Sequence, residues 1–329
     1  MRSGIEFLRR IAASAAGVTL GLALLAAPAA AQQDFPTRPM HVYIGFPAGS
    51  GADILGRYFT THLEKLAGKP VIVENKPGAN SNIAAGIVAK AKPDGYSILF
   101  VANSNMAGSR FLFKSLPFDT VKDFVPAATF ASIAFVVTVG AKSPLKTMAD
   151  LTAYLKGRGA KNKYGTTNQT AILASEYYKQ VAGVQGVNVA YRTAPEALPD
   201  VEDGTLDFMV MDGTFAMGAI KSGKIRALAV TTEQRIAGLP DVPTMKEAGL
   251  DFVWSPWWGV YLPVKTPTPI VEKIGNWMRE ITKTEETRKF LERIAALPMH
   301  DDTKAAHARL LADIEKWGPL VKAAKIEPQ

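Results

Sequence analysis

The order of strand-like and helix-like segments is the feature that most restricts how this chain can fold. From Val42 onward, short runs rich in β-branched and aromatic residues alternate with segments whose apolar residues recur every three to four positions. The first strand is predicted up to Phe46, and the helix that follows starts at Asp53 and is closed by Gly68, a glycine suited to a helix C-terminus. Strands that alternate with helices form sheets whose parallel strands are joined by crossover helices. The sequence therefore predicts an α/β fold.

The same alternation continues along the chain and passes into a second sheet. The apolar run 133–137 is long enough to cross from one sheet to another, and 329 residues suit two lobes better than one. We predict one lobe from residues 32–134 together with 256–329, a second lobe from residues 135–255, and hinge strands at 133–137 and 257–261. Thr147 and Asp150 predict a capping box at the start of a helix. Further strands are predicted at 71–73, 97–101, 164–165, 187–191, 208–211 and 225–231, and further helices at 82–91, 169–181 and from residues 269, 285 and 303.

The first 31 residues have the composition of a secretory signal peptide. Arg2, Arg9 and Arg10 precede an uncharged apolar stretch, and three alanines end at Ala31, where we predict cleavage. A membrane anchor is the alternative, but the stretch 11–27 is short for the hydrocarbon core of a bilayer. Arginine pairs also occur in ordinary signals, so the general and the twin-arginine export routes both stay open. We expect the mature protein to be exported to the periplasm.

Composition excludes several classes of site. The chain has no cysteine, which rules out a thiolate metal site and a cysteine nucleophile. Its formal net charge of +8 suits an anionic ligand or an anionic membrane face. The lysines and arginines are scattered among acidic residues and form no stripe with aromatic residues, so we expect no nucleic-acid partner.

A glycine-containing turn joins the first strand to the first helix. Backbone N–H groups at the start of a helix lack partners, and the helix dipole adds positive potential there, so such a turn can bind an anion without a charged side chain. Gly49 and Gly51 would let a ligand approach the backbone, and Asp53 would cap the helix or orient the loop. A tight connection that binds nothing is the alternative. The candidate loop consists of Phe46, Pro47, Ala48, Gly49, Ser50 and Gly51, with Asp53 following it.

Three later loops also follow strands and consist of small polar residues. In open α/β sheets the loops at the carboxyl ends of the strands form the ligand crevice. Hydroxyl and amide side chains there suit carboxylate oxygens, although turn or cap roles explain each of them equally well. Arg192 could bind a carboxylate with two parallel hydrogen bonds or form a surface salt bridge, and Trp258 could wall the pocket or fill the core. The remaining candidate ligand-binding residues are Asn103, Ser104, Asn105, Thr166, Thr167, Asn168, Thr170 and Asp212, with Thr214 beside the last of these.

Catalytic and metal-binding patterns are absent from the sequence. The four histidines, His41, His62, His300 and His307, have no metal-ligand spacing, and no nucleophile elbow, Walker lysine motif or dinucleotide fingerprint occurs. We therefore expect no metal, no cofactor and no enzymatic activity. A hydrolase or transferase that uses the Ser50 loop stays open as an alternative, because a base could come from elsewhere in the fold.

Several short segments occur in a specific order along nearly the whole mature chain. They are FPAG at 46–49, VENKPGA at 73–79, KPDGY at 92–96, LPFD at 116–119, KDF at 122–124, VAYR at 189–192, GKIRALAVT at 223–231 and LPDVPT at 239–244. In this order they resemble the Bug family of extracytoplasmic solute-binding receptors, of the tripartite tricarboxylate transporter type.

The resemblance implies a type II periplasmic-binding-protein fold, in which two lobes close on a carboxylate that loops of both lobes hold, partly through water. It implies that residues 46–53 form the first-lobe anion loop, flanked by 102–105, and that residues 165–170 and Asp212 make the second-lobe contacts. The family's ligands include di- and tricarboxylates, acidic amino acids, nicotinate-like molecules and aromatic carboxylates. Such a receptor closes by a hinge and passes its ligand to membrane transporter subunits or signals its presence. We expect it to act as a monomer.

The sequence departs from the family pattern in the loops that contact the ligand. The usual glycine pair of the first loop is Gly49-Ser50-Gly51-Ala52 here, and the family's later Gly-x-Gly segment is replaced by Asn80-Ser81-Asn82. Where many members carry Ala-Ser-Ala-Gly-Asn-Gly, this chain has the six residues from Tyr164 to Gln169. These changes leave the identity of the ligand open. Trp257 and Trp258 stand where one tryptophan and a tyrosine are more usual, which predicts a flatter ligand that stacks on Trp258. An interaction module with a vestigial cleft is a third hypothesis, beside the receptor and the enzyme.

Overall fold

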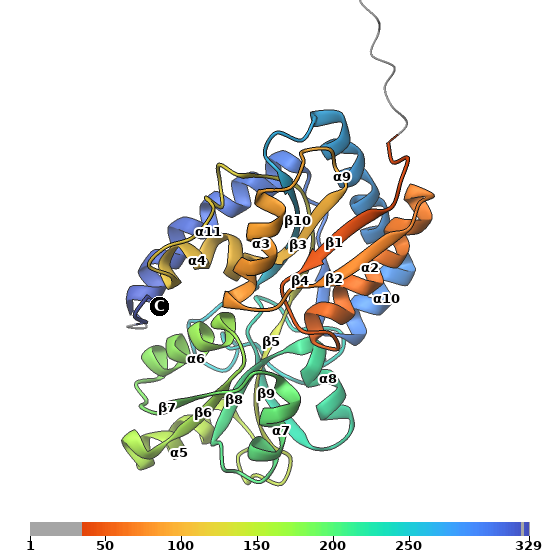
Figure 1. Ribbon diagram of the computed structural model, residues 1–329. Coiled ribbons are helices and arrows are strands. Elements are labelled where there is room, and N and C mark those ends of the chain that lie inside the picture. The colour runs from red at the N-terminus through yellow and green to blue at the C-terminus, as the bar shows by residue number, and fades with distance from the viewer. Residues whose placement is uncertain (1–34, 324–325, 329) are drawn as a thin grey trace, which may run out of the picture. The chain divides into compact units, whose positions relative to one another are not determined.

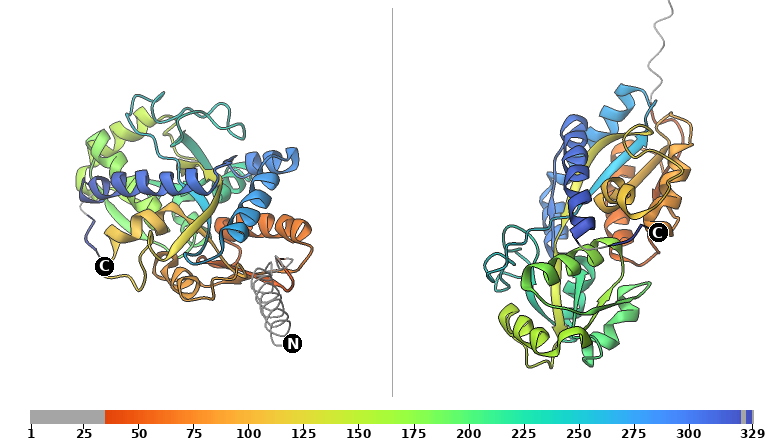
Figure 2. Two further views of the ribbon diagram at one scale, coloured as in Figure 1. Left: turned by 90° about the horizontal axis from the view of Figure 1, so that it is seen from above. Right: turned by 90° about the vertical axis from the view of Figure 1, so that its left-hand side faces the viewer.

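The computed structural model describes residues 35–323 and 326–328. The predicted signal peptide, residues 1–31, lies outside the described residues. Residues from Arg38 onward form one unit, and none of the helices described is long and apolar enough to cross a membrane. This unit is built on two separate β-sheets, each flanked by helices (Figure 1, Figure 2). The predicted α/β class is confirmed.

The first sheet has six strands and contains both early and late parts of the chain. Its order is β11–β4–β10–β3–β1–β2, with β1 at Met40–Ile44, β2 at Val71–Asn75, β3 at Ser97–Ala102, β4 at Phe124–Ile133, β10 at Trp257–Pro263 and β11 at Ala296–Pro298. β1 is parallel to β2 and β3, as predicted, but β10 is antiparallel to both β3 and β4. The sheet is therefore mixed, because β10 brings the chain back from the second sheet and enters at the end where β3 and β4 leave.

The second sheet has five strands from one continuous stretch of sequence. Its order is β7–β6–β8–β5–β9, with β5 at Phe135–Gly140, β6 at Lys163–Thr166, β7 at Val187–Ala190, β8 at Phe208–Asp212 and β9 at Ile225–Val230. β6 is parallel to β7 and β8, whereas β5 is antiparallel to β8 and β9. We call the half built on the six-stranded sheet lobe 1 and the half built on the five-stranded sheet lobe 2. The residue limits of the lobes given above remain a prediction.

The chain first passes from lobe 1 to lobe 2 at Ala134. The single crossing strand predicted here is two strands, because β4 ends at Ile133 and β5 begins at Phe135. The Ala134 N–H donates to the Ala295 carbonyl at 2.9 Å, and the Ala134 carbonyl accepts from the Gly213 N–H at 2.8 Å. Ala134 therefore bonds to a connecting segment of lobe 1 and to a helix start of lobe 2. We keep the prediction that a hinge lies at this crossing.

Helices cover both faces of the sheets. Apolar residues of α5 and α6 pack on one face of the five-stranded sheet, and those of α7 and α8 pack on the other. α11, the dark blue helix of Figure 2, packs on β4 of lobe 1 and also contacts α6 of lobe 2. The helices are α2 (Gly51–Ala67), η1 (Ala79–Ser81), α3 (Asn82–Ala89), η2 (Ser104–Gly108), α4 (Ser109–Leu112), α5 (Met148–Arg158), η3 (Gly159–Lys161), α6 (Gln169–Ala182), α7 (Ala194–Glu202), α8 (Gly213–Lys221), α9 (Thr268–Thr282), α10 (Glu285–Arg293) and α11 (Thr303–Ala323).

Several helix ends follow the predicted capping residues. Thr147 and Asp150 form the predicted capping box of α5. Gly68 closes α2 with a φ of 64°, a left-handed conformation that favours glycine. α2 begins two positions earlier than predicted, because the Ser50 hydroxyl accepts from the Asp53 N–H at 3.3 Å and so makes Ser50 the N-cap.

Two predicted polar loops have local structures that the sequence did not indicate. Asn82 begins α3 instead of preceding it, and follows a turn in which Ala79, Asn80 and Ser81 have φ values of 46°, 51° and 67°. Such left-handed conformations are costly for residues other than glycine. The segment after β3 is not an open loop but the single π-helical turn η2, which runs into α4.

Candidate ligand-binding cleft

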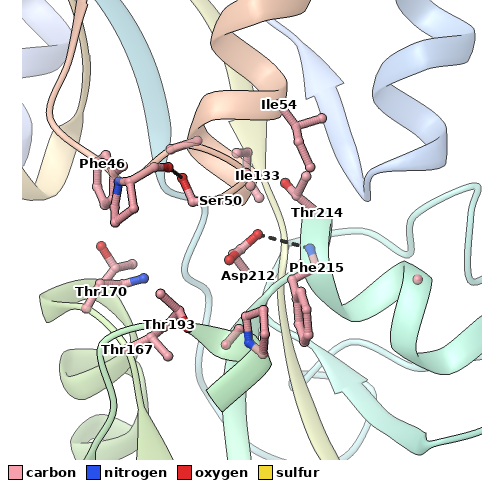
Figure 3. A pocket seen from close by; sticks show the side chains of 18 of the residues that line it. Phe46, Ser50, Ile54, Ile133, Thr167, Thr170, Thr193, Asp212, Thr214 and Phe215 are labelled. Atoms are coloured by element: carbon pink, nitrogen blue, oxygen red, sulfur yellow. Dashed lines mark hydrogen bonds between the residues drawn. The ribbon is translucent and has the colours of Figure 1, made fainter. Parts of the chain in front are cut away.

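A cavity of about 470 Å³ lies between the two lobes and is lined by residues of both. This volume is within the range typical of small-molecule sites. Figure 3 shows Phe46, Ser50 and Ile54 of lobe 1 on one side and Thr167, Thr170, Thr193 and Asp212 of lobe 2 on the other. The predicted residues that line it are Phe46, Pro47, Ala48, Gly49, Ser50, Gly51, Ser104, Thr167, Asn168, Thr170, Arg192, Asp212 and Trp258. That these residues touch a ligand remains a prediction.

Four helices begin at the wall of this cavity. Their N-cap residues Ser50, Asn168, Thr193 and Asp212 precede α2, α6, α7 and α8, and all four line the cavity. One of these helices belongs to lobe 1 and three belong to lobe 2. Because each helix start carries partial positive charge, the four together favour an anion in the space between them.

The first loop of lobe 1 is held by the buried carboxylate of Asp53. One Asp53 oxygen accepts from the Gly49 N–H and from Arg57 Nε, both at 2.9 Å, and the other accepts from Asn75 Nδ2 at 2.8 Å. Burial alone would raise the pKa of Asp53, but these hydrogen bonds outweigh burial and lower it below its ordinary value. Asp53 therefore orients the loop as an ionised group, while Ser50 caps the helix.

The two glycines of this loop have different structural roles. Gly49 has a φ of 78°, which favours glycine, and its N–H is already bonded to Asp53. A Cβ at Gly51 would stand 2.6 Å from Asp212 Oδ1 and 2.9 Å from Thr214 Cβ, so glycine is needed where α2 meets the start of α8. That a ligand approaches these glycines remains a prediction. The structure adds that Gly51 lets the starts of α2 and α8 lie close together.

Backbone donors remain available at the start of α2. Gly51 and Ala52 are the first two residues of the helix, so their N–H groups cannot bond within it. In the part of the chain that the structure describes, neither N–H has a hydrogen-bond partner. These amides, more than that of Gly49, are the donors that loop 46–51 can offer to an anion.

Lobe 2 contributes ionisable side chains to the cleft. Arg192 is exposed, lines the cavity, and makes no ion pair with any described carboxylate. The surface salt bridge considered for Arg192 is therefore not formed within the described residues. Thr193, which follows it, lines the cavity and makes no side-chain capping bond to α7, and its hydroxyl has no hydrogen-bond partner among the described residues.

Asp212 brings an acidic group to the same space. It is the N-cap of α8, and its Oδ1 accepts from the Phe215 N–H at 3.3 Å (dashed line in Figure 3). Burial raises the pKa of Asp212, and the hydrogen bonds from Phe215 and Thr214 only partly offset this effect. Asp212 accepts from a polar group of a ligand when ionised and can donate to one when protonated.

Aromatic side chains form one wall of the cavity. The Trp258 and Phe46 rings have centroids 5.5 Å apart and are tilted by 53°. Trp257 points the other way into the core, where its indole Nε1 donates to Asp313 at 2.7 Å. Of the two tryptophans, Trp258 therefore walls the pocket and Trp257 fills the core.

Four predicted residues do not line this cavity. Asp53 supports the loop, Asn103 Nδ2 donates to Asp313 at 2.9 Å, and Asn105 Nδ2 donates to Asn82 Oδ1 at 2.6 Å. Thr166 donates to Asn188 at 2.8 Å. Thr166 does line an adjoining cavity of about 700 Å³, which shares Phe46, Pro47, Thr167, Asn168, Arg192 and Thr193 with the first. The cleft thus has two connected parts.

Sequence reasoning missed several residues of the cleft. Thr193 and Pro195 are a helix-start signature, an N-cap followed by proline in the first turn, that could have placed a fourth helix end at the site. Phe215 and Gly218 carried no such signal, because their place depends on how α8 packs. No cluster of three or more potential metal-ligating side chains occurs within residues 35–323 and 326–328.

Two α/β lobes with helix starts aimed at a shared cavity define a two-lobed ligand-binding protein of the periplasmic-binding-protein class. Within that class, residues 55–326 match the family described as tripartite tricarboxylate transporter family receptor. The chain belongs to this receptor family, and the predicted resemblance is confirmed.

Solved structures of similar proteins agree with this assignment. The chain is similar to R. palustris Rpa4515 with adipate, at 28% identity and a TM-score of 0.85, over 90% of this chain and 100% of that one. It is similar to the periplasmic binding protein BugD, at 27% identity and a TM-score of 0.82, over 90% and 100% of the two chains. It is also similar to MatC from Rhodopseudomonas palustris with bound malate, at 26% identity and a TM-score of 0.79, over 87% and 100%. The predicted two-lobed fold is therefore confirmed.

Proposed function

We propose that this protein is a periplasmic receptor that binds a small organic carboxylate between its lobes. The observation that carries the proposal is the convergence of four helix starts, together with the unpaired Arg192, on one cavity. Two similar proteins of R. palustris contain adipate and malate. These ligands support a carboxylate here as well.

In this proposal the ligand joins the two lobes. The carboxylate accepts from the first-turn amides of α2 and from Arg192, and closure about Ala134 brings the two sets of donors together. The closed receptor then delivers the ligand to membrane transporter subunits or reports its presence to a sensor. We propose that it acts as a monomer and not as an enzyme, and that export requires cleavage after Ala31.

Thermal unfolding with a carboxylate panel tests the proposal. Malate, adipate, citrate, benzoate and nicotinate are each compared with the corresponding neutral amide. A ligand at 100 times its Kd stabilises the folded protein by about 2.7 kcal/mol, so a bound carboxylate gives a clear rise in Tm. The amides are expected to give none, because they lack the charge that the helix starts favour. A flat response to the whole panel would contradict the proposal and favour a vestigial cleft.

The alternative of a hydrolase or transferase is tested separately. The Ser50 hydroxyl donates to the Pro47 carbonyl at 2.6 Å and accepts from the Asp53 N–H, and no described histidine lines the cavity. A capping hydroxyl with no base beside it is a poor nucleophile. Ester or amide turnover by the pure protein that disappears in Ser50→Ala would favour the enzyme. We expect no turnover.

Export and oligomeric state have direct measurements. The intact mass of the protein recovered from the periplasm is expected to match that of a chain whose first residue is Gln32. Light scattering of the same sample is expected to give the mass of one chain, with or without ligand.

A further inference from the structure

The cavity continues beyond the space between the lobes, along one face of α8. Thr214, Phe215, Gly218 and Ala219 of α8 line it, together with Ser222, the C-cap that follows the helix, and these positions recur at the spacing of a single helical face. From the first to the last of these, the helix rises about 12 Å. The cavity therefore follows α8 over almost its whole length.

α7 forms the opposite side of this extension. α7 and α8 pack on the same face of the five-stranded sheet, and Pro195 and Leu198 of α7 line the cavity with Phe215 and Ala219 of α8. Ile54 of α2 also lines it and is 44% exposed. Figure 3 shows the Ile54 side chain directed toward Thr214. An apolar groove thus leads away from the helix starts.

The groove is longer than a short dicarboxylate. With C–C bonds of about 1.5 Å, the two carboxyl carbons of a four-carbon diacid are at most about 4.5 Å apart. Such a ligand occupies the space at the helix starts and leaves the face of α8 empty. Except for Thr214 at one end and Ser222 and Lys224 toward the other, the groove lining is apolar, so it suits a hydrocarbon chain more than a second charged group.

We infer that this groove is a subsite for the apolar chain of the ligand, so that the receptor prefers carboxylates with a linear chain of six or more carbons. The inference rests on the proposed function, because the helix starts hold the carboxylate head. Each methylene that enters the groove is expected to tighten Kd by about fourfold. Chain length, and not a second carboxylate, sets the affinity.

Gly218 offers a way to block the groove without disturbing the fold. It lies in the exposed face of α8, and a Cβ built there meets no atom within 4 Å. Leucine is also a better helix former than glycine, so Gly218→Leu is expected to fold. Gly157 of α5 is a matched control, because it is exposed, helical and equally open, and does not line the cavity.

Calorimetric titration with acetate, butyrate, hexanoate, octanoate and succinate tests the inference. In the unmodified protein, affinity is expected to rise with chain length, and octanoate is expected to bind more tightly than succinate. Gly218→Leu is expected to weaken octanoate binding at least tenfold and to leave acetate and succinate within twofold. Gly157→Leu is expected to match the unmodified protein for every ligand.

The outcomes separate the groove from the receptor function. Two results would contradict the proposed groove subsite and leave the proposed receptor function standing. One is succinate binding without any gain in affinity from chain length, and the other is equal weakening of acetate and octanoate binding in Gly218→Leu. The absence of binding by every carboxylate would overturn both.

Discussion

The two walls of the cleft differ in what they offer a ligand. Loop 46–51 of lobe 1 contributes backbone amides and apolar surface, whereas lobe 2 contributes Arg192, Asp212, Thr167 and Thr193. The lobe 1 loop is tied to Asp53 by hydrogen bonds to its backbone and to neighbouring side chains. On the lobe 2 side, the arginine and the Thr193 hydroxyl make no hydrogen bond within the described residues.

This difference indicates that the two lobes contribute differently to the affinity and the selectivity of ligand binding. A loop that is already fixed loses little conformational freedom when an anion binds, so the proposed function predicts that lobe 1 offers the same site to any carboxylate. Side chains with free donors can distinguish one ligand from another by charge and hydrogen bonding. The proposed function therefore predicts that lobe 1 contributes affinity for the carboxylate group and that lobe 2 distinguishes one ligand from another.

Arg192→Ala has the largest expected effect on binding and tests the role of lobe 2. Loss of a hydrogen bond to a charged group is expected to weaken carboxylate binding by about 10- to 100-fold. Arg192→Lys keeps the charge but loses the planar fork, so its Kd is expected to lie between the two. Calorimetric titration at fixed ionic strength measures all three proteins.

Arg235→Ala is the matched control for Arg192. Arg235 is an arginine of lobe 2 that pairs with Glu247 at 2.9 Å, and it does not line the cavity. Its substitution is expected to leave Kd unchanged. If both variants bound the ligand equally weakly, the loss of affinity would be due to the net charge of the protein and not to Arg192. The proposed difference between the lobes would then lose its main support.

Asp53→Ala tests whether the lobe 1 loop is fixed before a ligand binds. The substitution removes the acceptor for Gly49, Arg57 and Asn75, and the expected loss in free energy of unfolding is about 2 kcal/mol. The folded-state pKa of Asp53 lies below its ordinary value of 3.8, so its contribution is present above that pH and is lost as pH falls through the folded pKa.

Denaturant unfolding at pH 7, 5 and 3 measures this contribution. The difference between the unmodified protein and Asp53→Ala is expected to be constant from pH 7 to 5 and smaller at pH 3. Asp241→Ala, at an exposed site, is the control and is expected to change stability by less than about 0.5 kcal/mol at any of these values. A difference that does not depend on pH would mean that the ionised carboxylate does not hold the loop.

Gly51→Ala tests the contact between the lobes. The added Cβ would stand 2.6 Å from Asp212 Oδ1, so the start of α2 and the start of α8 must move apart. We expect Kd to rise about tenfold, equivalent to about 1.4 kcal/mol, and small-angle scattering to show a larger radius for the ligand-bound variant.

Gly49→Ala is the counterpart within the same loop. No atom lies within 4 Å of a Cβ there, but the φ of 78° disfavours alanine, so we expect a loss in stability of about 1 kcal/mol with no change in the bound radius. Identical scattering curves for the two variants would show that Gly51 does not set the approach of the lobes.

The sequence predicted what depends on local chemistry. Loop 46–51 stands between a strand and an amphipathic helix, and this order predicted a helix start after the loop, although two positions too late. Thr147 and Asp150 specify a capping box by their spacing alone. Local patterns of this kind gave the α/β class and the position of the first loop.

Long-range packing set the features that the sequence did not indicate. Asn103 and Asn105 follow a strand and were natural candidates for ligand contact, yet Asn103 bonds to Asp313, which is 210 positions away. The six-stranded sheet contains parallel and antiparallel strands because β10 enters it from the second sheet. The groove along α8 depends on how that helix packs beside α7. None of these contacts has a short-range signal in the sequence.

Asp212→Asn has the smallest expected effect and tests whether the acid of lobe 2 reduces stability. Burial raises the pKa of Asp212 above its ordinary value of 3.8, so the unmodified protein loses stability as pH rises from that value through the folded pKa. Asparagine is an equally good N-cap without the charge. Equal stability near pH 3 and a more stable variant at pH 7, measured by denaturant unfolding, are the expected results.

Asp212→Ala separates the cap from the charge. It removes the acceptor for the Phe215 N–H, so we expect it to be less stable than Asp212→Asn by about 1 kcal/mol at every pH. If Asp212→Asn were instead less stable than the unmodified protein at pH 7, the start of α8 would stabilise the carboxylate more than burial penalises it. Lobe 2 would then hold its acid in a fixed, favourable position as lobe 1 holds Asp53, and Arg192 and the threonines would be the polar side chains left to distinguish ligands.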